Sequence, residues 1–407
     1  MSLRDCHNAQ DFKPAARRRL PRPLFDYIEG GADDERTTAA NVLAFDRYTL
    51  APSYLKDIRT IDLRRRVLGM DLEWPLILSP TGMSRMFHPD GESGVARAAA
   101  SSGVAYSLST MGSDSIENIA RVSNGPKVYQ LYLLADDELN LAALDRCREA
   151  GYDAICLTVD TVVAGNRERD LRSGLTIPPA LTAKSLMEFA SRPAWCVGYL
   201  RGGKFSLPNI VARTAGGATD ISTLASFFAE KMERHISWNR VERLISHWNG
   251  PFAIKGLQSV ADARRAQGAG ASAVIVSNHG GRQLDGTPPV IDIVADIVDG
   301  VDGPLEVILD GGIRRGTHIV KALAMGASAC MTGRPYVYAL SAYGEPGVAR
   351  LLSLLRRETE RAMALLGCSS VDELSREQLR LADRLPAFLA NRATPETDLA
   401  LSHRSRS

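Results

Sequence analysis

Short apolar runs alternate with longer helical patterns through the middle of the chain. Eight of the runs are nearly continuous in apolar residues, as strands buried on both faces should be. The segments between them have helical periodicity, and several end at Gly, a common residue just past the end of a helix. The predicted strands are residues 75–80, 105–110, 127–132, 154–160, 252–257, 273–278, 306–311 and 329–334.

Eight successive βα units predict an α/β protein with a closed (β/α)8 TIM barrel. A doubly wound open sheet is the alternative that the same pattern permits. The number of strands favours the barrel, and so does the gathering of polar residues where the strands end, because barrel active sites are built at that face. These residues are Thr81, Thr110, Gln130, Tyr132, Asp160, Lys255, Asn278, His279, Asp310 and Arg334.

The remaining segments define the predicted domain organisation. Residues 1–74 are predicted to form a helical segment that packs on the barrel, and the barrel is predicted to span residues 75–385. Residues 161–237 form an insert after the fourth strand, much longer than a usual βα connection. We interpret this insert as a lid, a membrane-docking surface or a subunit contact. Residues 386–407 are predicted to be a loose tail or a subunit arm.

Composition and charge exclude several classes of function. The chain has 407 residues, with 49 Lys and Arg against 47 Asp and Glu, and a formal net charge of +2. This balance gives no electrostatic drive for binding nucleic acid. The six cysteines form no CxxC pair, so we expect neither a metal site nor a disulfide framework. With no run of 18 apolar residues and no apolar leader, we expect a cytoplasmic protein without a spanning helix.

The most informative polar stretch is SNHGGRQLDG, residues 277–286, directly after a predicted buried strand. It places His279 and Arg282 within one turn of each other. An imidazole beside a guanidinium suits removal of a proton from a substrate whose carboxylate is held by the arginine. A surface turn with a capping Asn or Asp is the alternative interpretation of the same stretch.

Two glycine-rich turns follow the last two predicted strands, DGGIRRG at residues 310–316 and TGRP at residues 332–335. Free N–H groups at the start of a helix bind phosphate, and Arg314 would supply a partner charge. A phosphate site after strands seven and eight is a recurrent feature of barrels. Since no GxGxxG follows an early strand, we expect an organic, phosphate-bearing electron acceptor other than a nicotinamide.

A series of motifs occurs in one order along the chain. They are FDYIEGGADDE (25–35), SPTGM (79–83), LSTMGSDSIE (108–117), YQLY (129–132), LTVD (157–160), NRERD (166–170), IKG (254–256), SNHGGRQLDG, DGGIRRG and TGRP. In this order they resemble the FMN-dependent (S)-2-hydroxy-acid dehydrogenases and oxidases, over about residues 10–385. The resemblance is strongest to the L-lactate and mandelate dehydrogenases. It implies FMN as cofactor and oxidation of a 2-hydroxy acid to the 2-oxo acid.

The resemblance also implies roles for individual side chains. His279 matches the base that removes the substrate hydroxyl proton, and Asp160 matches the carboxylate that supports the imidazolium. Arg167 and Arg282 match the pair that binds the substrate carboxylate. The phenols that contact carboxylate and hydroxyl are matched by Tyr27 and Tyr132.

A further set of residues matches the cofactor site of the family. Lys255 matches the ammonium beside the pyrimidine edge of the flavin, where negative charge grows on reduction. The matching residues around the flavin ring are Thr81, Gly82, Ser109, Gln130, Thr158 and Ser277, and those of the ribityl and phosphate site are Asp310, Gly312, Arg314, Gly333 and Arg334.

Two residues indicate substrate and electron acceptor. Met111 matches a position around the substrate side chain, where a bulky, flexible residue leaves room for a methyl group more readily than for a phenyl ring. This favours (S)-lactate, with a mandelate-type dehydrogenase as the alternative. Gly82 matches a position that is Ala in oxidases and Gly in several dehydrogenases. It favours a quinone or another carrier as acceptor, with an oxygen-using oxidase as the alternative.

The expected partners follow from the same comparison. The insert mixes apolar and aromatic residues with scattered Arg and Lys, a composition compatible with peripheral contact at the inner face of the cell membrane. The resemblance implies a homotetramer. His279, Arg282 and Arg167 argue against a non-catalytic FMN protein. Arg282 with Gln283 argues against a flavin enzyme that modifies a peptide-derived precursor.

Overall fold

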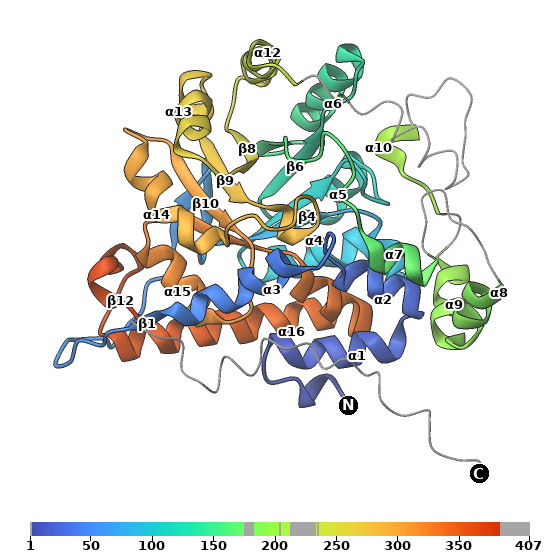
Figure 1. Cartoon of the computed structure of the whole chain (residues 1–407), viewed down its shortest axis with the longest axis horizontal. Coiled ribbons are helices and arrows are strands. Elements are labelled where there is room, and N and C mark those ends of the chain that lie inside the picture. Colours follow the sequence, from blue (N-terminus) through green and yellow to red (C-terminus); the bar gives the residue numbers. More distant parts are fainter. Residues whose placement is uncertain (1, 175–182, 203–204, 212–232, 234–235, 383–407) are drawn as a thin grey trace.

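Eight parallel strands close into a barrel in sequence order, with β11 pairing to β4 (Figure 1). The computed structural model describes residues 2–174, 183–202, 205–211, 233 and 236–382. The closed ring confirms the (β/α)8 prediction, and the open-sheet alternative is wrong. The strands are β4 (Leu76–Thr81), β5 (Ala105–Ser109), β6 (Lys127–Tyr132), β7 (Ala154–Thr158), β8 (Phe252–Leu257), β9 (Ala273–Ser277), β10 (Glu306–Asp310) and β11 (Ala329–Thr332).

Helices surround the barrel, and each strand is followed by at least one of them (Figure 1). Their apolar faces pack against the outward side chains of the strands and form the larger hydrophobic core. The surrounding helices are α4 (Gly91–Ser101), α5 (Ile116–Val122), α6 (Asp137–Glu149), α12 (Trp238–Trp248), α13 (Val260–Gly268), α14 (Val290–Gly300), α15 (Gly316–Ala324) and α16 (Arg334–Leu366).

The side chains inside the barrel are apolar at one end of its axis and polar at the other. A second core cluster fills the lower interior with small apolar residues, including Ala253 and Ile308. Two residues further along the same strands, Lys255 and Asp310 are also buried. Because side chains alternate between faces with a period of two, these polar residues point to the same inward side. The upper interior of the barrel is therefore polar, and this is where the site lies.

The segment before the barrel contains helices α1 (Phe12–Arg19), α2 (Arg22–Glu29) and α3 (Arg36–Leu43). It was expected to be helical, but it also supplies three short strands. Strand β1 (Tyr48–Leu50) pairs antiparallel with β12 (Leu379–Leu381). The hairpin of β2 (Arg65–Val67) and β3 (Met70–Leu72) packs into the lower core cluster and plugs that end of the barrel.

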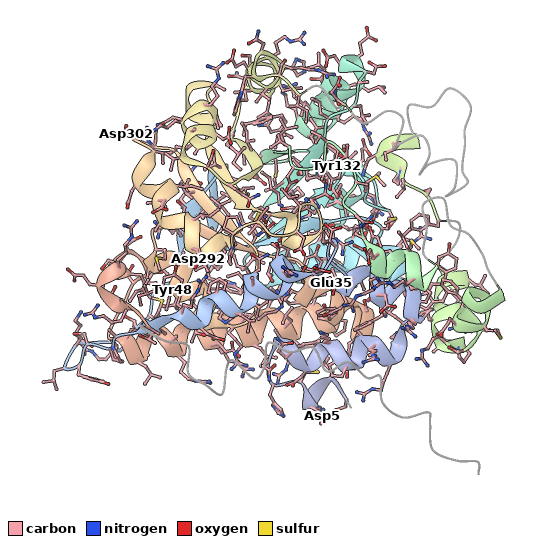
Figure 2. The ribbon with its side chains drawn as sticks, in the orientation of Figure 1. Asp5, Glu35, Tyr48, Tyr132, Asp292 and Asp302 are labelled. Carbon is pink, nitrogen blue, oxygen red and sulfur yellow. The ribbon has the colours of Figure 1, made fainter. Side chains whose placement is uncertain are left out.

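Strand β1 of this segment is tied to helix α14 by a polar contact. The Tyr48 hydroxyl donates to Asp292 Oδ1 at 2.8 Å, and both residues are labelled in Figure 2. Burial and the Asp292 carboxylate raise the pKa of Tyr48 to about 12. The phenol therefore stays a hydrogen-bond donor throughout the neutral range.

The insert contributes helices α7 (Glu168–Ser173), α8 (Ala183–Ala190), α9 (Pro193–Arg201) and α10 (Pro208–Val211). Helices α8 and α9 lie together at one side of the molecule, near α2 and α7 (Figure 1). Within the described ranges, no helix has the length and apolar composition needed to cross a membrane. The IPPALT motif of the insert (177–182) and the tail (386–407) lie outside the described residues.

Candidate active site

A cavity of about 790 Å³ opens at the carboxyl ends of the strands. Most of the predicted site residues line it, from nearly every strand end and from the segment before the barrel. They are Tyr27, Thr81, Gly82, Ser109, Met111, Tyr132, Arg167, Lys255, His279, Arg282, Asp310, Gly312, Arg314, Gly333 and Arg334. Four other predicted residues are not part of the lining, namely Gln130, Thr158, Asp160 and Ser277.

His279 and Asp160 form a pair at one wall of the cavity. The Nδ1 atom of His279 lies 2.9 Å from Asp160 Oδ1, which leaves Nε2 free of this contact. Burial by itself would raise the pKa of Asp160, but the neighbouring His279 and Lys255 lower it below its ordinary value. An ionised carboxylate on Nδ1 fixes the orientation of the ring and stabilises its protonated form. The pair can therefore take up a proton at Nε2.

The backbone around this pair is strained. His279 has a φ of 56°, in the left-handed region that non-glycine residues rarely adopt, and Gly280 continues it with a φ of 64°. Across the pair, Gly256 has a φ of 108°, and a Cβ built there would lie 2.7 Å from Asp160 Cβ and Cγ. The glycines of HGG and IKG thus permit the close approach of His279 and Asp160.

Two guanidinium groups form an anion site beside the histidine. The Cζ atoms of Arg167 and Arg282 lie 5.2 Å and 4.9 Å from the centroid of the Tyr27 ring. Burial, and then the neighbouring Arg167, lower the pKa of Arg282 to about 10. In the described part of the chain, Arg282 has no carboxylate within ion-pair distance. Two adjacent, half-buried guanidiniums are well suited to bind a substrate carboxylate.

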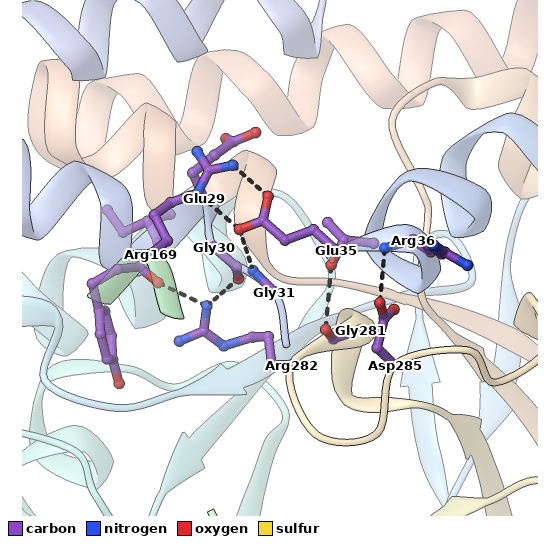
Figure 3. Close-up of polar contacts among 12 residues, drawn as sticks. Glu29, Gly30, Gly31, Glu35, Arg36, Arg169, Gly281, Arg282 and Asp285 are labelled. Atoms are coloured by element: carbon purple, nitrogen blue, oxygen red, sulfur yellow. Dashed lines mark hydrogen bonds and ion pairs between the residues drawn. The ribbon is translucent and has the colours of Figure 1, made fainter. Parts of the chain in front are cut away.

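Tyr27 reaches the cavity because two arginines hold the end of helix α2. Arg282 donates to the carbonyls of Tyr27 and Gly30, at 2.7 Å and 2.8 Å, and the second of these contacts is drawn in Figure 3. Arg334 donates to the carbonyls of Ile28, Gly30 and Gly280. Carbonyls at the end of a helix lack partners within it and carry partial negative charge, so cations stabilise them.

The same HGGRQLDG loop holds two further segments. Gln283 donates to the carbonyls of Asp160 and Val163 and accepts from the Gly165 N–H. Asp285 accepts from the N–H groups of Arg36, shown in Figure 3, and Thr37, at the first turn of α3. These two residues were not predicted as site residues. Both residues belong to the SNHGGRQLDG motif, but the backbone groups that they contact are seen only in the folded structure.

Lys255 stands at the centre of the polar upper interior. Its Nζ atom lies 2.7 Å from Asp310 Oδ2 and 2.9 Å from Ser277 Oγ. Burial would lower the pKa of Lys255, but Asp310 and Asp160 raise it well above its ordinary value. Ser79, which sequence reasoning missed, donates to the other oxygen of Asp310 at 2.7 Å. Lys255 therefore presents a fixed positive charge to the cavity.

Three polar groups in and behind the cavity wall lack either a hydrogen bond or a counter-charge among the described residues. The Nε2 atom of Gln130 is buried without a hydrogen bond, while its Oε1 accepts from Ser109. Arg314 and Arg334 line the cavity near the glycine-rich turns, and burial lowers the pKa of both. Among the described residues neither has a carboxylate within ion-pair distance. An amide nitrogen without a hydrogen bond and two guanidiniums without a carboxylate partner fit a polar ring system that carries a phosphate.

A family model described as FMN-dependent dehydrogenase matches residues 16–381. The chain belongs to this family. FMN has a polar ring and a phosphate, which match this amide and these guanidiniums. Gln130, Thr158 and Lys255 would face the ring, and Arg314 and Arg334 would hold the phosphate. When bound, FMN supplies the two-electron acceptor of the oxidation.

Known members of the family cover almost the whole chain. Glycolate oxidase 3 of Arabidopsis thaliana is 37% identical over 383 residues, 94% of this chain and 98% of that protein. L-lactate dehydrogenase of Caulobacter sp. (strain K31) is 39% identical over 376 residues, 92% and 98% of the two chains. The crystal structure of the monotopic membrane protein (S)-mandelate dehydrogenase has a TM-score of 0.89 at 35% identity, covering 93% and 100%. This FMN-dependent dehydrogenase is therefore an oxidoreductase that acts on 2-hydroxy acids.

Replacing Asp160 with Asn tests the histidine pair. We expect reduction of the bound flavin by substrate to slow by roughly 10²–10⁴-fold, because the protonated His279 loses its counter-charge. Bound FMN, measured by absorption, should remain. Folding lowers the pKa of Asp160 below its ordinary value of 3.8. The ionised carboxylate therefore stabilises the folded state above that pH, and this contribution is lost as the pH falls through the lowered pKa. The free energy of unfolding of the variant should therefore fall less in acid than that of the parent. A rate of flavin reduction equal to that of the parent would show that Asp160 has no role in the site.

Proposed function

We propose that this enzyme oxidises (S)-lactate, or a 2-hydroxy acid of similar size, to the 2-oxo acid. The observation that carries this choice is the wall around Met111. Met111 lines the cavity and packs against a buried cluster of Phe205, Leu207 and Ile210 from the insert. A residue supported from behind cannot move back to admit a phenyl ring without displacing packed side chains. The relation to an L-lactate dehydrogenase agrees with a small substrate.

A mandelate-type substrate is the second candidate. Its support is the overall similarity to (S)-mandelate dehydrogenase, with a TM-score of 0.89. Met83 also lines the cavity beside Met111, and methionine side chains adapt their shape.

In the proposed reaction, Arg167 and Arg282 hold the substrate carboxylate and thereby fix the orientation of the 2-carbon. The Nε2 atom of His279 takes the hydroxyl proton, and Asp160 stabilises the imidazolium that forms. Burial raises the pKa of Tyr132 well above its ordinary value, so its phenol stays protonated and donates to the substrate oxygen. The C2–H bond breaks as the hydroxyl becomes a carbonyl, and FMN, when bound, would take up this hydrogen together with the two electrons of the bond.

We further propose a quinone or a similar carrier as the electron acceptor, and a peripheral position at the cytoplasmic face of the membrane. Helices α8 and α9 expose Met187, Val197 and Leu200, with 67%, 46% and 77% of each residue accessible. Arg192, just before α9, donates to the Leu20 carbonyl, which places this surface beside the exposed basic end of α1. An apolar surface next to basic residues suits an anionic lipid surface. The homotetramer stays a prediction.

The substrate proposal is tested by purification and anaerobic titration. The protein should copurify with non-covalent FMN, and (S)-lactate should bleach the flavin faster than (S)-mandelate does. His279→Gln is the matched control: it should retain FMN and lose bleaching, since the base that accepts the hydroxyl proton is gone. Faster bleaching by (S)-mandelate would favour the second candidate, and bleaching of the control at the parent rate would contradict the role of His279.

The acceptor is tested by reoxidation of the reduced enzyme. A soluble quinone analogue should reoxidise the flavin faster than oxygen does, because Gly82 matches the residue of several dehydrogenases. Stopped-flow absorption gives both rates at equal acceptor concentration. If oxygen is the faster acceptor, the enzyme is an oxidase and this part of the proposal is wrong.

Membrane contact is tested with vesicles that contain anionic lipid. The parent protein should sediment with them, and the pair Met187→Asp and Leu200→Asp should abolish this, because charged residues oppose insertion of the surface. Leu365→Asp, at a residue of α16 that is 65% exposed, is the control and should sediment like the parent. If the parent stays in the supernatant, the docking role of α8 and α9 is refuted.

A further inference from the structure

One buried carboxylate in the cavity has no part in the reaction described above. Asp170 lies on helix α7, three residues after Arg167, and is only 4% exposed. It lines the cavity beside the two arginines of the anion site. Its Oδ2 atom lies 3.4 Å from Arg167 Nε, and its Oδ1 atom is buried without any hydrogen bond. A buried carboxylate oxygen without a donor is costly to keep, so its presence in the cavity points to a use.

The charges around Asp170 indicate that use. Burial raises its pKa, whereas the charges of Arg167 and Arg282 oppose that shift. Two further charges act on the pKa of Asp170: Asp26 raises it and Arg169 lowers it. The inner anion site therefore holds two guanidiniums and one carboxylate, an excess of one positive charge. Elsewhere in the cavity, Lys255 is paired with Asp310.

We propose that Asp170 limits the anion site to monoanions, so that the enzyme selects 2-hydroxy monocarboxylates against dicarboxylates. This inference rests on the proposed function, since it assumes that Arg167 and Arg282 hold the substrate carboxylate. With Asp170 ionised, one substrate carboxylate neutralises the site. A second carboxylate would meet Asp170 across a cavity walled by protein, where like charges repel more strongly than in bulk water.

The surroundings of the substrate side chain strengthen the argument. The lining next to the anion site is apolar there, with Met83, Phe87 and Met111. None of these residues offers a cation or a donor side chain to a second carboxylate. Rejection of a dianion therefore depends on the net charge of the anion site, and the carboxylate of Asp170 lowers that charge from two positive charges to one.

The test is Asp170→Asn, which keeps the shape of the side chain and removes its charge. The ratio of kcat/KM for (S)-malate to kcat/KM for (S)-lactate should rise by roughly tenfold or more over the parent. Glu168→Gln is the matched control, because it removes one negative charge from the outer face of the same helix, where Glu168 pairs with Arg172. Its ratio should equal that of the parent. A merely structural defect would weaken both substrates alike, so an unchanged or lower ratio in Asp170→Asn overturns the proposal.

A binding measurement separates this proposal from the proposed function. The rise in Tm caused by oxalate, a dianion, and by acetate, a monoanion, gives relative affinities without turnover. In Asp170→Asn the affinity ratio of oxalate to acetate should rise by roughly tenfold, because a dianion gains twice the interaction energy from one added positive charge. If no 2-hydroxy acid reduces the parent flavin, the proposed function fails, and this ratio still decides the role of Asp170. An unchanged ratio refutes it.

Discussion

The loop from His279 to Gly286 is the constraint on which the rest of the site depends. Its side chains bond to backbone groups that their own helices and strands leave unpaired, at the end of α2, the start of α3 and the segment after β7. Buried backbone groups of this kind must find a partner somewhere. Because the loop supplies those partners and also carries the histidine, it fixes Tyr27 and Asp160 relative to the base.

The cavity is lined by more positively than negatively charged side chains. The site buries more positive than negative groups, and burial of an unpaired charge is costly unless a counter-ion arrives. The Lys255–Asp310 pair is satisfied within the protein, whereas Arg282, Arg314 and Arg334 have no carboxylate partner among the described residues. This excess of positive charge suits the phosphate of FMN and the carboxylate of a 2-hydroxy acid.

Much of the fold could be predicted because its signal is local. The apolar runs predicted the bounds of all eight strands to within about two residues. Because side chains alternate along a strand, Lys255 and Ala253 point to the same inward face, with Lys255 nearer the site. The N-terminal segment was harder. Strands β1, β2 and β3 are three residues long, too short for a periodic pattern, and β1 pairs with a strand more than 300 residues later.

By itself, the sequence determined the barrel, the order of its strands and the chemistry at their ends, since these follow from side-chain period and residue type. The resemblance to a family extended this to the cofactor and to His279, Arg167 and Arg282. Only the tertiary structure decided which groups are in contact. It showed that Asp285 caps α3, that Met111 is supported by the insert and that one carboxylate oxygen of Asp170 is buried without a hydrogen bond beside the anion site. Such contacts join residues whose separation along the chain obeys no period, and their energy depends on burial, which exists only once the chain has folded.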